Sequence, residues 1–427
     1  MIRPQQVEPV LTPAFLFTIA GLFSLAGLAP TGLAAVQTFP ETVLEDVNGD
    51  GAWAGPRIVS ADGRNELVFE GLFQATGAWV ESGRDPRMDF GLKRMRPEFA
   101  GRFVDTLRFR LEPNFSEHEV ELEEAWIGVD VLGGDAVAMA GRMKVPFGLE
   151  EVRSRRHINF PRFSILNQFS PAEDHGLFLV GRSPSRLWEY GASLTNGTGG
   201  EDTSSSKDLA ARVMAHPFAK RPASIWRNLQ FGVAATFGTQ FDAPGGFAVE
   251  NAAGQEVIEM AAGTRLAGER QRLGFEVAWF RGPWFLQAEH LNMEQDMSGA
   301  GGSDAVRFEG TYLELAHVLT GERKTFAGVV PDLPFDPSSG AGRGAWVLAA
   351  RYSDLHSDSS LETLGLAQGG TYTDNIRSAS LALNWVMNRH MILRHAYVHS
   401  FYTDDVSAGG RVQDDEGALL LELQLHF

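Results

Sequence analysis

The sequence predicts an all-β fold: a transmembrane antiparallel β-barrel of about 16 strands, with short turns at one rim and long loops at the other. Three observations favour it. In the closing segment LLLELQLHF (419–427), every second residue is leucine or the final phenylalanine. Alternating segments of about ten residues, separated by turns, recur from residue 66 onward. An apolar segment of the kind that directs export stands near the start of the chain.

The closing segment shows why alternation indicates a membrane wall. A period of two places successive side chains on opposite faces of a strand. The leucine row suits lipid, whereas Glu422, Gln424 and His426 on the other face suit water. The same alternation is found in residues 106–112, 125–131, 229–237, 273–279 and 346–353.

Three consecutive regions are expected along the chain. Residues 14–28 form an uncharged apolar run, and GLAA at 32–35 offers small residues for cleavage. The run is short for a membrane helix, which needs about 20 residues. We therefore expect a signal peptide at 1–35, an N-terminal periplasmic segment at 36–65 and the barrel at 66–427. A retained N-terminal anchor helix remains an alternative.

Composition and charge exclude several classes of function. The chain has no cysteine, which rules out disulfides, thiol nucleophiles and cysteine metal sites. A net charge of −17 argues against nucleic acid as a partner. The segment DVNGDG at 46–51 matches the first half of a calcium loop, but Arg57 stands where the loop needs glutamate, so a plain turn is the alternative. No catalytic residue, cofactor or metal site is expected.

The connections between strands are of two kinds. Tight turns are predicted at 133–135, 281–283 and 387–389, on the periplasmic rim. Closure of the sheet into a barrel would leave no exposed edge strand. A soluble β-sandwich is the alternative fold. Long, polar loops are predicted on the opposite rim at 199–207, 242–263, 296–304, 332–343, 356–374 and 403–416.

Basic side chains dominate the face that alternation assigns to the lumen. On the lipid face each cation would cost roughly 2–4 kcal/mol at mid-depth, so the inside is favoured. Arg394 joins this set only in a doubtful register, because His395 follows it. The predicted inward set is Arg94, Arg96, Arg102, Arg108, Arg110, Arg142, Lys144, Arg212, Arg272 and Arg351.

Such a lining suits small anions. Guanidinium groups bind phosphate or carboxylate in a bidentate manner, and rows of Arg and Lys are how anion pores select. Carboxylates sort inward as well, and by pairing with the arginines they would leave a mixed, weakly selective pore. Anion preference, weak selectivity and cation preference therefore all stay open. The inward acids are Glu98, Glu112, Glu124, Asp130, Glu276, Glu289 and Glu314.

The irregular stretch at 145–176 carries a second basic cluster, Arg153, Arg155 and Arg156. It lacks strand alternation and is rich in Pro, Asn and Phe. A loop of this kind either folds inward and constricts the channel, or stays outside with its arginines paired to neighbouring acids. The residues themselves favour neither reading.

Several ordered motifs resemble the phosphate-selective porin O and P family of bacterial outer-membrane porins. GRMKVPFGLEE at 141–151 is similar to its glycine-basic-Pro-Phe-Gly-Leu-Glu signature, and FGLKRMRPEFAGRF at 90–103 to its early basic strand. LTGERKTF at 319–326, GAWVLAARYSDL at 344–355 and LNWVMNRHM at 383–391 follow in the family's order. Val347 and Val386 depart from the pattern, as does the loop after PFGLEE.

The resemblance implies a sixteen-stranded barrel assembled as a homotrimer in outer-membrane lipid, with an arginine-lined path and an inward third loop. The implied function is passive diffusion of small hydrophilic solutes, with anions such as phosphate preferred. A nonselective porin and a structural or adhesive barrel are the alternatives. A barrel enzyme is disfavoured, because the chain has no GxSxG run and no Ser–His–acid set sorts inward together.

Overall fold

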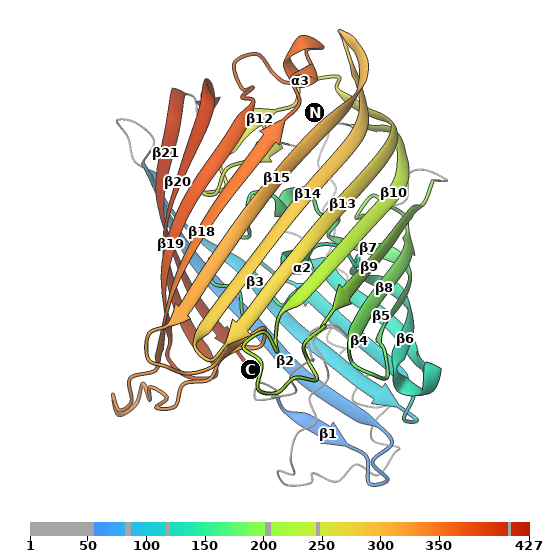
Figure 1. Ribbon diagram of the computed structural model, residues 1–427, viewed down its shortest axis with the longest axis vertical. Coiled ribbons are helices and arrows are strands. Elements are labelled where there is room, and N and C mark those ends of the chain that lie inside the picture. Colours follow the sequence, from blue (N-terminus) through green and yellow to red (C-terminus); the bar gives the residue numbers. More distant parts are fainter. Residues whose placement is uncertain (1–54, 82–86, 117–119, 201–205, 245–247, 409–410) are drawn as a thin grey trace, which may run out of the picture.

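The computed structural model describes residues 55–81, 87–116, 120–200, 206–244, 248–408 and 411–427. Within them one antiparallel sheet of 17 strands wraps into a barrel (Figure 1). The first strand, β1 (Arg57–Val59), pairs only with β2, so the other sixteen form the wall. No helix in these ranges is long and apolar enough to cross a membrane. The predicted fold class is confirmed.

The barrel closes between its first and last wall strands, β2 (Glu66–Glu81) and β21 (Arg411–His426), in a register that runs from Leu72↔His426 to Glu81↔Gly417. Every other wall strand pairs with its neighbours in the chain. These strands are β3 (Arg87–Phe103), β4 (Leu107–Asn114), β5 (Glu121–Val131), β6 (Ala136–Lys144), β7 (Glu173–Arg182), β8 (Trp188–Thr195), β9 (Asp208–Ala215), β10 (Gln230–Pro244), β13 (Arg265–Arg281), β14 (Trp284–Gly299), β15 (Gly302–Val318), β18 (Ala345–Ser357), β19 (Asn375–Val386) and β20 (Met391–Ala408).

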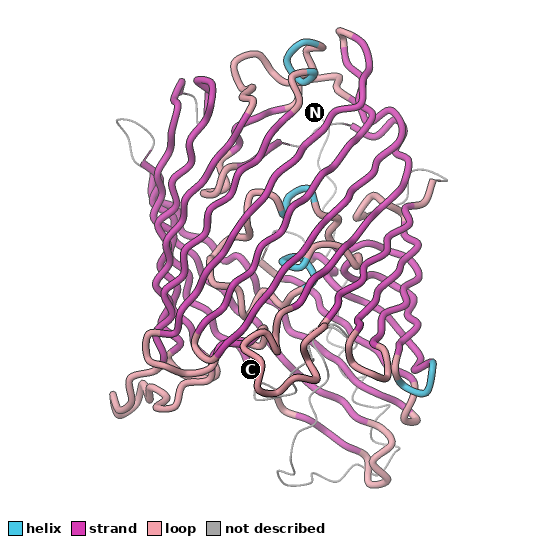
Figure 2. The backbone as a smooth tube through the Cα atoms, viewed as in Figure 1, coloured by secondary structure: helices cyan, strands magenta, loops and turns pink. Residues whose placement is uncertain are grey.

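Short elements occupy the connections (Figure 2). Two small hairpins, β11–β12 and β16–β17, form separate two-stranded sheets. The bounds of the short elements are β11 (Ala248–Glu250), β12 (Glu256–Glu259), β16 (Lys324–Thr325), β17 (Gly328–Val329), α2 (Leu149–Val152), α3 (Ser360–Thr363) and the single-turn helices η1 (Leu132–Gly134) and η2 (Asn167–Phe169).

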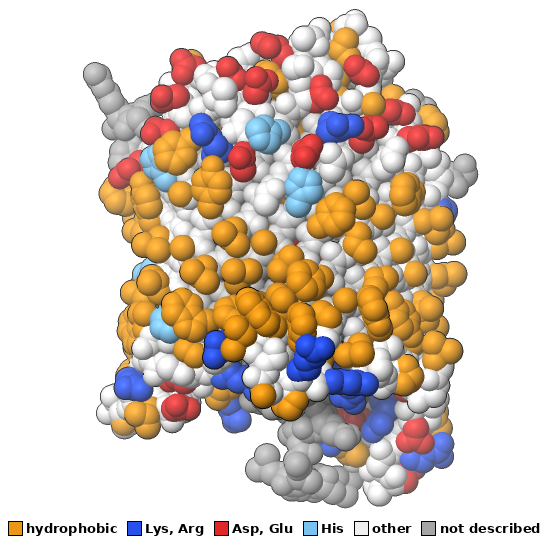
Figure 3. All heavy atoms as spheres, viewed as in Figure 1, with side chains coloured by type: hydrophobic (Ala, Val, Ile, Leu, Met, Phe, Trp, Pro, Cys, Tyr) orange, Lys and Arg blue, Asp and Glu red, His pale blue; other side chains and the backbone are white. Residues whose placement is uncertain are grey.

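The predicted alternation separates the two faces of the wall. Along β21, Leu419 and its row partners up to Phe427 are 39–47% exposed, whereas Glu422, Gln424 and His426 are almost fully buried inside. Figure 3 shows the outward apolar side chains as a continuous band on one side of the barrel. On this side, acidic groups gather beyond the band's upper edge and basic groups beyond its lower edge. A wall of this construction fits a bilayer.

The two rims differ from the prediction in three places. Residues 332–343 belong to the connection from β15 to β18, at the rim where the chain ends, since the amide of Phe335 donates to the carbonyl of Met387. The predicted loops at 296–304 and 403–416 are largely strand, because β14 and β15 pair as far as Gly299↔Gly302, and β20 and β21 as far as Ala408↔Arg411. The last two predictions were wrong because the strands extend beyond the apolar band, and their residues in that part are polar.

The first prediction concerns the final residue. The Phe427 backbone exchanges hydrogen bonds with Gly71, at 2.9 and 3.2 Å, and its ring lies 5.5 Å from that of Phe69. Phe427→Ala removes this apolar contact at the closing seam, and we expect the unfolding free energy to fall by about 1–3 kcal/mol. The heat-induced mobility shift of the folded barrel on a gel measures this. Val412→Ala, a 72% exposed position on the same strand, is the control and should leave the shift unchanged.

Candidate functional site: a loop across the barrel lumen

One long connection, here named the inward loop (residues 145–172), leaves the wall after β6 and returns to it at β7. The two wall strands stay paired up to Lys144↔Glu173, so the loop starts and ends side by side. Figures 1 and 2 show its helix α2 in the middle of the barrel. Of the two alternatives for this segment, the one in which it folds into the barrel is therefore correct.

The inward loop is fastened to the opposite wall by polar contacts. The amides of Leu149 and Glu150 both donate to the Glu289 carboxylate of β14, at 2.7 Å each. Glu150 also pairs with Arg351 of β18 at 3.1 Å, and the Asn159 side chain donates to Glu314 of β15 at 2.6 Å. Burial raises the pKa of Glu150, while Arg351 acts in the opposite direction.

Strands β20 and β21 hold the loop by its backbone. Arg394 of β20 donates to the carbonyl of Ile158 at 3.0 Å and to that of Arg156 at 2.7 Å. Gln424 of β21 donates to the same Arg156 carbonyl at 3.0 Å. Arg394 therefore lies inward, which the sequence had left open. Its guanidinium group holds the inward loop in position.

The PFGLEE motif explains how the chain enters the lumen. Gly148 has a φ of +76°, a conformation that side chains rarely adopt, and it redirects the backbone into α2. Phe147 is fully buried against the wall. Its ring packs so closely on Gly274 of β13 that a Cβ added to this glycine would lie 3.2 Å from the ring. The motif therefore anchors the first turn of the loop.

Apolar packing fills one side of the lumen, contrary to the expected polar lining. Inward side chains of β14, β15, β18, β19 and β20 form one cluster with the inward loop and the β11–β12 hairpin. Phe169 of the loop stacks on Phe308 of β15 with ring centroids 4.6 Å apart. The predicted external loop at 242–263 thus contributes Val249, Val257 and Ile258 to the barrel interior.

The long rim connection from β15 to β18 supports the inward loop from the end where the chain terminates. The Arg153 guanidinium lies 4.2 Å from the centre of the Phe326 ring. Lys324 donates to the carbonyl of His157 at 3.5 Å. Burial, with Arg153 nearby, lowers the pKa of Lys324 to about 7.

Three cavities in the described part of the chain lie on the other side of the lumen, next to β2–β10 and β13. The upper cavity (about 270 Å³) lies between β3, the inward loop and the β11–β12 hairpin. The lower cavity (about 30 Å³) lies between the loop and β2–β7. The side cavity (about 200 Å³) lies between the end of the loop and β7–β10 and β13.

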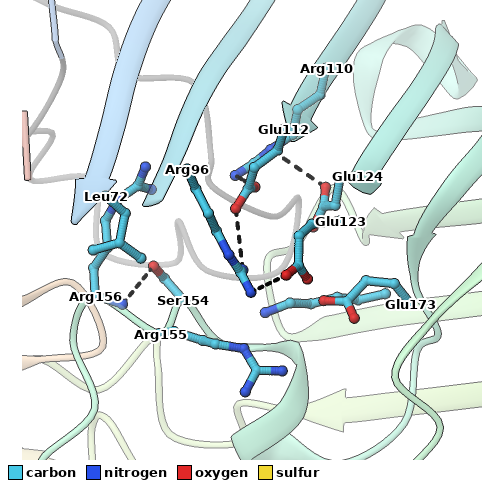
Figure 4. A pocket seen from close by; sticks show the side chains of 11 residues that line it. Leu72, Arg96, Arg110, Glu112, Glu123, Glu124, Ser154, Arg155, Arg156 and Glu173 are labelled. Carbon is cyan, nitrogen blue, oxygen red and sulfur yellow. Dashed lines mark hydrogen bonds and ion pairs between the residues drawn. The ribbon is translucent and has the colours of Figure 1, made fainter. Parts of the chain in front are cut away.

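The lower cavity is a network of nearly balanced charge (Figure 4). Arg110 pairs with Glu98 at 2.9 Å, with Glu112 at 3.3 Å and with Glu124 at 3.4 Å. Arg96 lies between Glu112, at 3.4 Å, and Glu123, with which it makes a close ion pair. Its five cations, Arg96, Arg110, Lys144, Arg155 and Arg156, face four carboxylates, Glu112, Glu123, Glu124 and Glu173.

The upper cavity is predominantly basic because of a β-bulge. The β2–β3 register passes from Gln74↔Arg94 to Ala75↔Leu92, so Lys93 has no partner and turns into the lumen beside Arg94. Lys93, Arg94, Arg155 and Arg162 line the cavity with a single carboxylate, Glu250. No carboxylate of the described residues lies within ion-pair distance of Lys93 or Arg94.

The side cavity contains two arginines and three carboxylates. Arg270 pairs with Asp208 at 2.8 Å, and Arg272 donates to the Phe169 carbonyl at 2.7 Å and to Thr236 at 3.3 Å. Glu173 and Asp174 complete the charged lining. Arg212 lies nearby but is held by Glu276 at 2.6 Å.

The structure places most of the predicted pore residues inside. Arg142 is the correction: the register pairs it with Ala125 and with the exposed His175, on the face of Leu177, and it donates to the carbonyl of Leu122. Lys144, two residues later, reaches the lower cavity where the strand leaves the sheet. The inward or loop-borne set is Arg94, Arg96, Arg102, Arg108, Arg110, Lys144, Arg153, Arg155, Arg156, Arg212, Arg272 and Arg351.

Sequence reasoning missed Lys93 and Glu123. Both are bulged residues, since the β4–β5 register likewise shifts from Glu112↔Glu124 to Pro113↔Leu122. A bulge lets two consecutive charged residues face inward, which strict alternation forbids. The adjacent charges in LKRMR (92–96) and LEE (122–124) are the available signal.

The second prediction tests how the inward loop is held. Besides the two loop amides, Glu289 accepts a 2.5 Å hydrogen bond from Tyr312. Glu289→Gln replaces one accepting oxygen by an amide nitrogen that cannot accept, and each hydrogen bond lost contributes about 0.5–1.5 kcal/mol. We expect larger fluctuations of the open-channel current in single-channel recordings. Glu309→Gln, on the outer face of β15, is the matched control, and equal noise in both variants would contradict the anchoring role.

Comparison with known proteins agrees with this architecture. The model of the family "Phosphate-selective porin O and P" matches residues 76–427. Porin O of Pseudomonas aeruginosa is 26% identical over 146 residues, which cover 34% of this chain and 32% of that protein. The chain thus matches about a third of the length of that curated relative.

Solved structures of outer-membrane proteins share the fold at low identity. The outer membrane channel DcaP of Acinetobacter baumannii aligns at a TM-score of 0.55 and 10% identity, over 88% of this chain and all of that one. The anion-selective porin from Comamonas acidovorans aligns at 0.54 and 10%, over 85% and 100%. OmpT of Vibrio cholerae aligns at 0.54 and 12%, over 85% and 98%. The chain therefore belongs to the phosphate-selective porin O and P family, and its location is the outer membrane of a Gram-negative bacterium.

Proposed function

We propose that this protein is a passive outer-membrane channel for small hydrophilic solutes that prefers anions, with phosphate-like ions among them. Family membership and fold support a channel rather than an enzyme. One observation carries the anion preference: four basic side chains and one carboxylate line the upper cavity. Lys93 and Arg94 attract anions there without carboxylates at contact distance.

The path that we propose runs along the charged side of the lumen. An anion enters at the loop rim, meets Lys93 and Arg94, and then passes the arginines of the lower cavity. The paired carboxylates beside Arg96 and Arg110 keep the second region weakly binding, so that no site retains the ion. Many shallow sites of this kind favour throughput.

We also propose that the protein assembles as a homotrimer. An OmpT structure of Vibrio cholerae with a TM-score of 0.53 is described as a trimer form, and its likeness to this chain is one of fold. The protein in mild detergent should then have a mass three times that of its chain, measured by light scattering with a correction for bound detergent.

The anion preference is tested by the reversal potential of the purified full-length protein in a planar bilayer under a potassium chloride gradient. The sign expected is that of chloride preference. A potential of the opposite sign would overturn the proposal. Replacing chloride by phosphate on one side then measures how far phosphate permeates.

A weakly selective diffusion pore is the second candidate. The near balance of charge in the lower cavity, and the excess of carboxylates in the side cavity, favour it. It predicts a reversal potential near zero in the same recording.

A further inference from the structure

The upper cavity combines cations with an apolar wall. Beside Lys93 and Arg94 it is lined by Ile158, Pro161 and Phe163 of the inward loop. We propose that this cavity binds organic anions whose charge is attached to a flat apolar group, with aryl carboxylates as the class. This inference rests on the proposed channel function and goes further by naming the preferred substrate class.

The cationic end retains unused donors. Lys93 Nζ donates to the Pro161 carbonyl, which occupies one of the three N–H bonds of the ammonium. Arg94 donates from Nη1 to Gln74 at 2.6 Å, while its buried Nε has no hydrogen-bond partner among the described residues. A carboxylate placed beside these two side chains would accept hydrogen bonds from the Lys93 ammonium and supply a counter-charge for both cations.

The apolar end lies on the same loop. Ile158 and Ile165 are 8% and 4% exposed and so form a closed floor, while the Phe163 ring is half-buried. Arg155 lies 4.3 Å from the centre of the Phe163 ring, a cation–π arrangement that fixes the ring. An aromatic group of the solute would displace water from this surface, whereas inorganic phosphate and acetate would not.

The cavity has a defined shape because its far side is tied together. Gln168 accepts a 2.8 Å hydrogen bond from the Glu250 amide, and Glu250 pairs with Arg162. Asn251 donates to Tyr402 at 2.8 Å and to Glu416 at 2.9 Å. These contacts join the inward loop, the β11–β12 hairpin and the wall. A preformed cavity of about 270 Å³ has room for one ring with its carboxylate.

The experiment uses the full-length protein in planar bilayers, first in a potassium chloride gradient and then with added benzoate, acetate or phosphate. Block of the chloride current gives a half-blocking concentration for each probe. We expect that of benzoate to be about tenfold lower than that of acetate, which corresponds to roughly 1.4 kcal/mol. Phe163→Ala should remove this difference and leave the acetate value unchanged. Phe163→Leu keeps an apolar side chain and should lose only part of it.

Lys93→Gln together with Arg94→Gln should weaken block by both carboxylates. Phe231→Ala, at an exposed position on the outer wall, is the matched control and should change neither value. If benzoate blocks no better than acetate in a channel that prefers chloride, the inference is wrong and the proposed function stands. If the unmodified channel prefers potassium, the proposed function itself fails.

Discussion

Excision of the tip of the inward loop, with residues 150–168 replaced by a short Gly-Ser linker, should raise the single-channel conductance several-fold. The paired positions Lys144 and Glu173 bring the ends of the loop together, so a short linker closes the gap without moving the wall. The removed segment carries the contacts to β15, β18, β19 and β20, and it separates the cavities from the apolar side. Single-channel recording in potassium chloride measures the change.

A control deletion of residues 336–341, in the exposed part of the β15–β18 connection, should leave the conductance close to that of the intact protein. If both deletions give the same conductance, the inward loop does not set the width of the channel. The heat-induced mobility shift should be recorded for each variant, because the excision also removes part of the apolar cluster that the loop forms with the wall.

Arg110→Ala is expected to have the largest effect of any single substitution in the lower cavity. It leaves Glu98, Glu112 and Glu124 without the cation that all three contact. Loss of one partner from a buried ion pair costs about 3–5 kcal/mol. The anion-to-cation permeability ratio should also fall, since the cavity loses its excess positive charge and four cations then face four carboxylates. Reversal potentials and thermal unfolding of the same preparation measure both effects.

Arg108→Ala provides the comparison. Arg108 lies inward on the same strand, and among the described residues it pairs with Asp130 alone, at 2.6 Å; its side chain is 23% exposed. Its removal leaves one carboxylate without a cation instead of three, and that carboxylate is partly exposed, so we expect a smaller loss of stability than for Arg110→Ala. Equal losses of stability in the two variants would show that the network of three carboxylates around Arg110 stabilises the barrel no more than a single ion pair does.

The alternation of β4 illustrates how much of the wall can be predicted from sequence. Leu107 and Leu111 face outward and Arg108 and Arg110 inward, because a strand between lipid and water must sort its side chains by solvent. The same rule failed at Lys93 and Glu123. A bulge depends on how two strands pair, and that information is absent from either strand alone.

The apolar side of the lumen shows a different limit. Near the loop rim of β14 and β15 the usual order is inverted, with Glu294 and Arg307 outward and Met293 and Phe308 inward. A period of two identifies two faces but not which one is inside. Above the apolar band the outer face meets water, while the inner face meets the folded loops. Only the packing of the inward loop and the β11–β12 hairpin settles this arrangement.

Some expectations lie outside the described residues. The predicted signal peptide at 1–35 and the calcium-like segment at 46–51 both fall in that part of the chain. Within the described residues, no group of three or more His, Asp or Glu side chains could hold a metal ion.

We expect solutes to pass between the inward loop and the wall strands β2–β6. The chain has no cysteine, so a single introduced cysteine reports on access by itself. The direct measurement is the current through the Arg94→Cys variant after treatment with a negatively charged methanethiosulfonate reagent, compared with Ala349→Cys, whose side chain faces inward on β18 but is covered. We expect a lower current and a weaker anion preference for the first variant and no change for the second. An unchanged current at position 94, with block at position 349, would contradict it.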